Sequence, residues 1–239
     1  MSRSEQSQRD RAGARDSAAV TRTRRDPVQQ RSRQRIADIL SATALLVDEL
    51  GPDDVTTTLI AQRLGISVGS IYTYFDDRSA IFDAIVARSI AAHDAMVARI
   101  VLDGPSDDWF ATAEAIIDSL VAVYRTEPGF RSLWFSRHLS PDMLEAMRRT
   151  DEAQARAALA RFTACGFTVD AANRLDAMRL YVGLVDKGLD LAFRLDPKGK
   201  PAVIAETKRV VRLYLGACLT SLPGSKGQRR QSSAARLSS

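Results

Sequence analysis

The segment from Thr56 to Phe82, TTTLIAQRLGISVGSIYTYFDDRSAIF, constrains the fold of this 239-residue chain more than any other part of it. Thr57 belongs to a residue type that caps helix N-termini, and three apolar residues at helical spacing follow it: Leu59, Ile60 and Leu64. Gly65 comes next, where a helix end favours a residue that tolerates positive φ. The pattern predicts a short helix that ends at a tight turn.

A second short helix is predicted directly after that turn. Ser67 is placed to cap it, and it should run from Val68 to about Phe75. Two short helices joined by three or four residues with a glycine between them form a helix-turn-helix unit, whose second helix enters the DNA major groove. The sequence therefore predicts a DNA-reading segment, followed at once by another helix.

The same residues carry a resemblance to a known family. VTTTLIAQRLGISVGSIYTYF, with Arg78 and Ile81 after it, resembles the N-terminal domain of TetR-type (TetR/AcrR-like) helix-turn-helix transcriptional regulators. The likeness begins near Arg33, in RQRIADILSATALLVDELG, and fades after about Arg88. It implies a DNA-binding domain at 28–77 and a helical effector-binding and dimerisation domain at 78–221. The family usually has Lys where this chain has Arg78, and either cation can contact a phosphate.

Expected DNA contacts come from the two short helices. The hydroxyls of Thr57 and Thr58 suit a phosphate oxygen. The resemblance implies base contacts at Val68, Gly69 and Ser70, and phosphate contacts at Tyr72, Thr73, Tyr74 and Arg78. No Arg, Lys, Asn or Gln lies between Val68 and Phe75, so the strong bidentate pairings to guanine and adenine are absent from this helix. We expect modest specificity per half-site, supplemented by dimer spacing, DNA shape and an arginine-rich arm.

Charge is distributed unevenly along the chain. Residues 1–35 hold ten Arg and four acidic residues, and residues 222–239 hold four basic residues and no acid. The whole chain carries +5, so residues 36–221 form an acidic body between two basic ends. We expect a disordered basic arm at 1–27 and a disordered basic tail at 222–239. Either end could contact nucleic acid or only aid solubility.

Several protein classes are disfavoured by the sequence. It has no run of eighteen apolar residues and no apolar stretch after the first basic residues, so we expect a cytoplasmic protein without a membrane span. Cys165 and Cys218 are expected to be reduced core residues. His93 and His138, the only histidines, have no partner at metal-ligand spacing, and we expect no metal or cofactor. No catalytic grouping, phosphate loop or dinucleotide fingerprint is present, so we expect no enzyme.

Elsewhere the pattern predicts helices and no strand. The predicted helices run after Pro27 to about Leu50, from Arg78 (capped by Asp76 or Asp77) to about Leu102, from a Ser106 cap to Thr126, from Phe130 to His138, from Pro141 (capped by Ser140) to about Ala164, from a Thr168 cap to about Leu195, and from Pro201 to Ser221. The first of them should bury Ile36, Leu40, Ala44, Leu45 and Val47. Together with the two short helices they make an all-α, nine-helix architecture.

An effector pocket is implied by the resemblance. Trp134, Phe135, His138 and Tyr181 are the candidate lining residues, since aromatic rings with polar atoms cluster there. They suggest a small hydrophobic or aromatic effector. Asp186 and Asp190, with Lys187 and Arg194 nearby, are interpreted as a solvated ion-pair face.

Dimerisation is predicted from the last two helices, which are more apolar than one buried face needs. The residues concerned are Val203, Ile204, Val210, Val211, Tyr214, Leu215, Cys218 and Leu219, with Leu175, Val182, Leu184, Val185, Leu189 and Phe193. They could equally be the core of a monomer. A twofold dimer would place two recognition helices about 34–36 Å apart on a near-palindromic operator.

We therefore expect a homodimeric DNA-binding repressor that a small ligand releases from its operator. The alternative is a TetR-like regulator without an effector, whose large domain only dimerises or binds a protein. An enzyme with an appended DNA-binding segment is a third class, which the missing catalytic residues disfavour.

Overall fold

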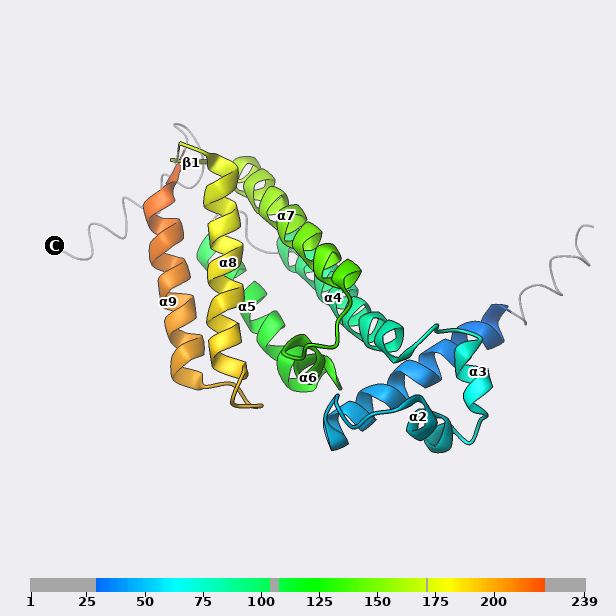
Figure 1. Ribbon diagram of the computed structural model, residues 1–239. Helices are drawn as coiled ribbons and strands as arrows, with labels where there is room; N and C mark the ends of the chain where they lie inside the picture. Colours follow the sequence, from blue (N-terminus) through cyan, green and yellow to red (C-terminus); the bar gives the residue numbers. More distant parts are fainter. Residues whose placement is uncertain (1–28, 104–107, 171, 222–239) are drawn as a thin grey trace, which may run out of the picture.

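The computed structural model describes residues 29–103, 108–170 and 172–221, and these are almost entirely helical (Figure 1). The predicted arm (1–27), the predicted tail (222–239) and Ser106 lie outside the described residues. Within those ranges there are nine helices, one at 29–50 and eight labelled α2 to α9. The predicted all-α architecture is confirmed. No helix in the described part of the chain is long and apolar enough to cross a membrane.

The first helix (29–50), α2 (Thr57–Leu64) and α3 (Val68–Tyr72) form the group at one end of the molecule (Figure 1). Ile60 and Ile71 are fully buried between them. One predicted core residue of the first helix is wrong: Leu45 is 48% exposed, whereas Leu46 is 3% exposed. Leu45 shares an exposed side of the first helix with Glu49, one turn further on, whereas Ala44 lies against the segment at Gly129.

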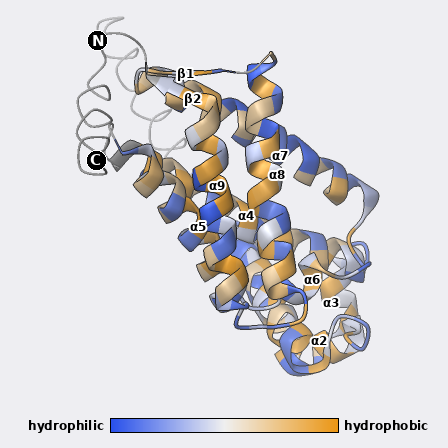
Figure 2. Ribbon diagram, turned by 90° about the vertical axis from the view of Figure 1, so that its left-hand side faces the viewer, coloured by the Kyte–Doolittle hydropathy of each residue, from blue (hydrophilic) through white to orange (hydrophobic). Residues whose placement is uncertain are grey.

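The larger domain consists of six helices. They are α4 (Arg78–Asp103), α5 (Trp109–Thr126), α6 (Phe130–Trp134), α7 (Pro141–Ala164), α8 (Arg174–Phe193) and α9 (Pro201–Cys218). Helices α8 and α9 lie side by side, with hydrophobic residues along both (Figures 1 and 2). Their close approach requires Gly188, because a Cβ there would lie 2.2 Å from the Thr207 hydroxyl.

Two short strands contradict the expectation of a strand-free chain. Strand β1 (Phe167–Val169) pairs antiparallel with β2 (Leu219–Ser221), and Thr168 lies opposite Thr220. Thr168 is therefore not a helix cap. Asn173 caps α8 instead, where its Oδ1 accepts from the N–H groups of Leu175 and Asp176. The last helix ends at Cys218, because the chain then enters the strand.

Other helix boundaries depend on local capping. Ser67, Asp77 and Ser140 cap as predicted. The cap of α2 is Thr56 rather than Thr57, and Asp108 caps α5. Helices α3 and α6 end at Tyr72 and Trp134, before the predicted ends at Phe75 and His138.

Candidate nucleic-acid interface and internal cavities

The turn between α2 and α3 fixes the geometry of the helix pair. Gly65 has φ 63°, a left-handed conformation, and its N–H bonds to the carbonyls that end α2. The Ser67 hydroxyl accepts from the Ser70 N–H at 3.2 Å and opens α3. Arg63 pairs with Glu49 at 2.5 Å and so holds α2 against the first helix. The helix pair is thus oriented by contacts at its turn and on its back.

The outer surface of α3 carries most of the predicted DNA contacts. Gly69 and Thr73 are exposed, and Tyr72 is 52% exposed. Val68, Ser70 and Tyr74 are half-buried, with Val68 and Tyr74 packed against the core next to Ile71 and Phe75, the two residues predicted to face inward. The structure therefore presents Gly69, Tyr72 and Thr73 most openly.

Hydroxyl groups from α2 and α3 meet at one place. The Tyr72 hydroxyl lies 3.4 Å from the Thr57 hydroxyl, although the two residues are fifteen apart in sequence. Thr58 is exposed in the same turn of α2. This patch of short donors has the chemistry of a phosphate contact.

Arg78 has contacts that sequence reasoning did not foresee. Its guanidinium Nη1 donates to the carbonyls of Pro52, Asp53 and Val55, at 3.3, 3.1 and 2.7 Å. It also lies over the Phe82 ring, 5.4 Å from the centroid. These bonds hold the loop that precedes α2, and the expected phosphate contact stays a prediction.

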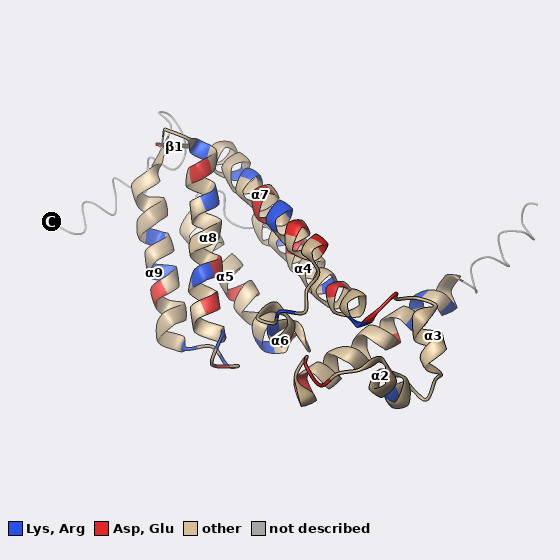
Figure 3. Ribbon diagram, viewed as in Figure 1, with Lys and Arg blue, Asp and Glu red and all other residues tan. Residues whose placement is uncertain are grey.

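Positive charge near the helix pair comes mainly from the first helix. Arg31, Arg33 and Arg35 lie at its N-terminal end, where Figure 3 shows blue segments. In α2 and α3 the one cation is Arg63, which Glu49 already neutralises. Electrostatic attraction to DNA would therefore come from outside the two short helices.

A cavity of about 560 Å³, partly open at the surface, lies in the larger domain between α4, α5, α7 and α8. Its wall is mostly apolar, with residues such as Val97, Ile116, Phe162, Val182 and Val185. Tyr181, one of the predicted pocket residues, is part of this wall. Its volume is within the range of sites for small ligands.

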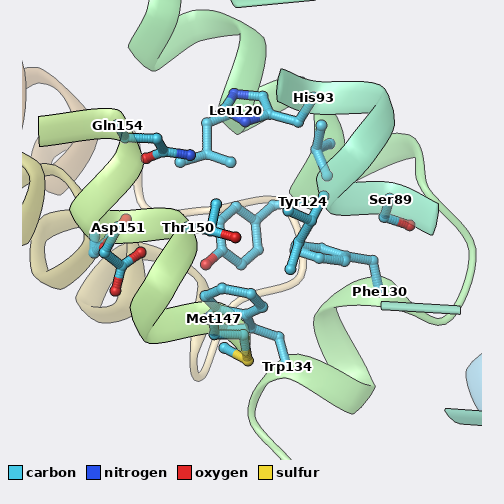
Figure 4. Close-up of a pocket in the computed structure, with 13 residues that line it drawn as sticks. Ser89, His93, Leu120, Tyr124, Phe130, Trp134, Met147, Thr150, Asp151 and Gln154 are labelled. Atoms are coloured by element: carbon cyan, nitrogen blue, oxygen red, sulfur yellow. The ribbon is translucent and has the colours of Figure 1, made fainter. Parts of the chain in front are cut away.

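A smaller cavity of about 50 Å³ adjoins it. The two share five lining residues, namely His93, Leu120, Thr150, Gln154 and Asp186. Trp134, the second predicted pocket residue to be placed in a cavity, lines the smaller one. In Figure 4, Thr150, Asp151 and Gln154 project from α7 on one side, and Tyr124 and Phe130 lie on the other.

Polar groups in the cavity walls are only partly paired. The Ser119 hydroxyl lies 3.2 Å from His93 Nε2, and Gln154 donates to Asp94 at 3.0 Å. Burial lowers the pKa of His93, so the ring is neutral at pH 7. Burial raises the pKa of Asp186 to about 7, and the charge of Asp151 adds to this shift.

The interpretation of Asp186 as part of a solvated ion-pair face is therefore wrong. Asp190 pairs with Lys187 at 2.7 Å and also contacts Arg194, but it is buried, at 9% exposure, so it is not part of a solvated face either. Asp186 lines both cavities, whereas Asp190 lines neither. Sequence reasoning missed this difference because Asp186 stands next to Lys187 and one turn before Asp190, so the two acids were grouped.

Two predicted lining residues lie elsewhere. Neither cavity is lined by Phe135 or His138. Phe135 stacks on Tyr124 at 5.9 Å, and His138 Nε2 lies 2.7 Å from Asp53 Oδ1 at the DNA-binding end. The reason is that α6 ends at Trp134, so these residues do not share its helical face.

Within the described residues, no group of three or more His, Cys, Asp or Glu is arranged to hold a metal ion. Cys165 and Cys218 are free thiols, as predicted.

Comparisons with known proteins give matches over most of the chain. Residues 39–85 match the family model of bacterial regulatory proteins of the tetR family, and residues 107–219 match the model of the tetracyclin repressor-like C-terminal domain. A curated HTH-type transcriptional repressor of Mycobacterium tuberculosis is 27% identical over 193 residues, which cover 73% of this chain and 91% of that protein.

Solved structures show the same fold. A TetR-family transcriptional regulator from Streptomyces coelicolor has a TM-score of 0.61 at 24% identity, covering 77% of this chain and 99% of its own. A TetR regulator from Haloarcula marismortui has a TM-score of 0.61 at 18% identity, covering 78% and 99%.

Proposed function

Since this chain belongs to the TetR family of DNA-binding transcriptional regulators, we propose that it is a dimeric repressor released from a near-palindromic operator by a small ligand. The observation that carries the ligand step is the cavity of about 560 Å³ between α4, α5, α7 and α8. A large domain that only dimerised or docked a protein would have no need of such a space.

The DNA-facing surface in this proposal is the exposed side of α3 and the N-terminus of α2. Gly69 allows close approach to the base edges, and Val68 and Ser70 flank it. The hydroxyls of Thr57, Thr58, Tyr72 and Thr73, with Tyr74 and Arg78 beside them, would position the helix on phosphates.

Two routes connect the cavities to the DNA-binding end. Helix α4 lines both cavities at His93, and its first turn belongs to the core that covers α3. Helix α6 lines the smaller cavity with Trp134, and just before it the Gly129 N–H donates to Asp48 of the first helix at 2.9 Å. A ligand that displaced either helix would shift the recognition helices.

The ligand acts only if it binds the released arrangement more tightly than the DNA-bound one. A hundredfold preference corresponds to a coupling free energy of about 2.7 kcal/mol. Saturating ligand would then weaken operator affinity up to about a hundredfold.

The second recognition helix would come from a twofold partner. Many of the apolar residues predicted for the interface are instead buried within one protomer, among them Val182, Leu189, Val211 and Leu215. Other residues of α8 and α9 are left exposed: Leu180 at 53%, Leu191 at 58% and Leu213 at 59%. We propose that these three leucines form the dimer contact.

Selection of bound duplexes from a random DNA pool tests the DNA-binding proposal. We expect a near-palindrome with half-sites one helical turn, or a multiple, apart. Removing residues 1–25 should lower affinity and the salt slope if the basic arm contacts DNA.

The Tyr72→Phe variant tests the hydroxyl patch. It should weaken binding about 3- to 10-fold, equally for all duplex sequences, because a phosphate contact positions without reading bases. Tyr214→Phe is the matched control, since the Tyr214 hydroxyl donates to Ala177 in the larger domain. Equal affinity for Tyr72→Phe and the parent chain would remove this patch from the interface.

A further inference from the structure

The charges in the cavity walls are predominantly negative. Asp94, Asp151 and Asp186 line the cavities, against one permanent cation, Arg161. Asp94 accepts the Gln154 amide. Among the described residues neither Asp151 nor Asp186 forms an ion pair. Two carboxyl groups thus border the small cavity without a cationic partner from the protein.

Arg161 is too distant to neutralise them. It lines only the larger cavity and lies seven residues along α7 from Gln154, which is about 10 Å along the helix axis. Its positive charge lies at the end of the large cavity that Phe162 and Cys165 also line. The small cavity therefore keeps a negative potential of its own.

Part of the remaining wall of the small cavity is aromatic. Tyr124, Phe130 and Trp134 line it, with Tyr124 and Trp134 edge to face at 6.4 Å. Met147 adds a polarisable thioether. Carboxylates together with aromatic rings are the groups that recognise an organic ammonium ion in proteins.

The two cavities differ in size and polarity in a way that suits one ligand. The small one, about 50 Å³, has room for a compact head group, and the large one, about 560 Å³, has a mostly hydrocarbon wall. They share Asp186, Thr150 and Leu120, so the two cavities adjoin at these residues. In a bound ligand, the junction between the charged head group and the hydrocarbon part should lie at the boundary between the two cavities.

We propose that the effector is an amphiphilic organic cation, whose ammonium group lies in the small cavity by Asp186, Asp151 and Trp134 and whose apolar body fills the large cavity. This assignment rests on the proposed effector role of the cavity. In this proposal the Asp186 carboxylate is the main partner of the ammonium group. Trp134 is a residue of α6, so ligand binding against its ring would displace that helix. A fatty acid or an acyl phosphate would bring a negative charge against three carboxyl groups.

Binding of three probes to the full chain by calorimetry at pH 8 tests the ligand class. The probes are decyltrimethylammonium, 1-decanol and decanoate, each below its aggregation concentration, since they share one hydrocarbon tail. We expect the cation to bind at least tenfold more tightly than either of the others. Decanoate or decanol binding as tightly as the cation would overturn the proposal.

Variants locate the head group. Asp186→Asn should weaken decyltrimethylammonium binding about tenfold, a loss of about 1.4 kcal/mol, and leave 1-decanol within twofold. Asp186→Glu should retain most of the affinity. The matched control is Asp176→Asn on the same helix, whose carboxylate pairs with Arg179 outside the cavities. An equal effect of Asp186→Asn on all three probes would contradict the assignment.

Trp134→Leu and Asp151→Asn repeat the test on other helices, so a poorly folded Asp186 variant would not leave the question open. Both variants should lose more affinity for decyltrimethylammonium than for 1-decanol. Equal losses for the two probes in both variants would place the head group elsewhere.

Operator release separates this inference from the proposed function. With a labelled duplex from the selection, decyltrimethylammonium should release the parent protein and not Asp186→Asn at the same concentration. Tight, Asp186-dependent binding that leaves the duplex bound supports the ligand class and refutes induction. Release by 1-decanol without release by the cation supports induction and refutes the ligand class.

Discussion

At the scale of single residues, Asp186 is the side chain whose placement is hardest to explain by folding alone. Its carboxyl group lines two cavities, and burial raises its pKa to about 7, so ionisation at neutral pH opposes the folded state. Tyr124 responds to it, since burial and the nearby charges of Asp186 and Asp190 raise the pKa of that phenol. A group that weakens the empty protein is characteristic of a binding site.

The first prediction concerns stability against pH. The Asp186 carboxyl ionises near 3.8 when unfolded and near 7 when folded, so the folded state holds more protons between these values and stability falls as pH rises through them. Asp186→Asn removes this dependence and should raise the free energy of unfolding at pH 8 by up to about 4 kcal/mol. At pH 4 the gain should vanish. Urea unfolding at both pH values is the measurement, and an equal shift at both would contradict the assignment.

Sequence reasoning identified part of the cavity at this scale. Trp134 and Tyr181, two of the predicted lining residues, do line the cavities, because large rings with polar atoms within apolar helices favour interior surfaces. Asp186 and Asp151 could not be found in this way. Residues four apart lie only about 40° apart around a helix, so charge patterning does not resolve which of two such carboxyl groups faces a cavity.

At the scale of elements, the short helix α6 connects the two domains. Phe130 and Trp134 line the small cavity from it. Before it, Gly129 contacts the first helix, and after it, His138 pairs with Asp53 at 2.7 Å and accepts the Ser79 hydroxyl through its carbonyl at 2.8 Å. The predicted pocket residue His138 therefore belongs to a domain junction.

A Gly129→Ala variant tests this junction. Gly129 has φ 74°, and a Cβ there would lie 3.0 Å from the Ala44 Cα, so alanine brings backbone strain and a close contact with the first helix. We expect a loss of about 1–3 kcal/mol in unfolding free energy, and an operator affinity that responds less to ligand. Gly51→Ala is the control, with φ 82° and no neighbour within 4 Å, because it brings the strain without the contact. If both variants showed the same unfolding free energy and the same ligand response, the contact at Gly129 would have no role in connecting the two domains.

Several helix ends were predicted correctly from local signals, although the caps of α2, α5 and α8 were not. Gly65, Ser67 and Ser140 marked helix ends correctly, since a cap is decided by its own residue and the next three. The strands at 167–169 and 219–221 were missed because each is three residues long and depends on a partner about fifty residues away. Such pairing leaves no periodicity to read.

At the scale of the whole molecule, the exposed leucines of α8 and α9 form the proposed dimer contact. The sequence indicated an apolar excess on these helices but assigned it to residues that one protomer buries itself, such as Val211 and Leu215. The face left over contains Leu180 and Leu213, together with Gly183, whose missing side chain leaves open space within 4 Å. This face is where a twofold partner would fit.

Leu180→Glu combined with Leu213→Glu should convert the dimer to monomer, because two charges from each protomer would be buried at the interface. Sedimentation should show the halved mass, and operator affinity should fall at least 100-fold while the helical circular dichroism is kept. Leu144→Glu on α7, where leucine is 44% exposed, is the control and should stay dimeric. A double variant with unchanged mass would move the interface to another surface.

The exposed surface of α3 has room for new side chains that would change which operator sequence the protein prefers. A Cβ at Gly69 would meet only the Ser67 hydroxyl, at 3.9 Å, so longer side chains can be installed there without displacing neighbours. Arginine at this position would favour guanine in the operator, and glutamine would favour adenine. The cavity and the proposed dimer contact lie on other helices and would be unchanged. The same ligand-responsive protein could thus be given a different operator sequence.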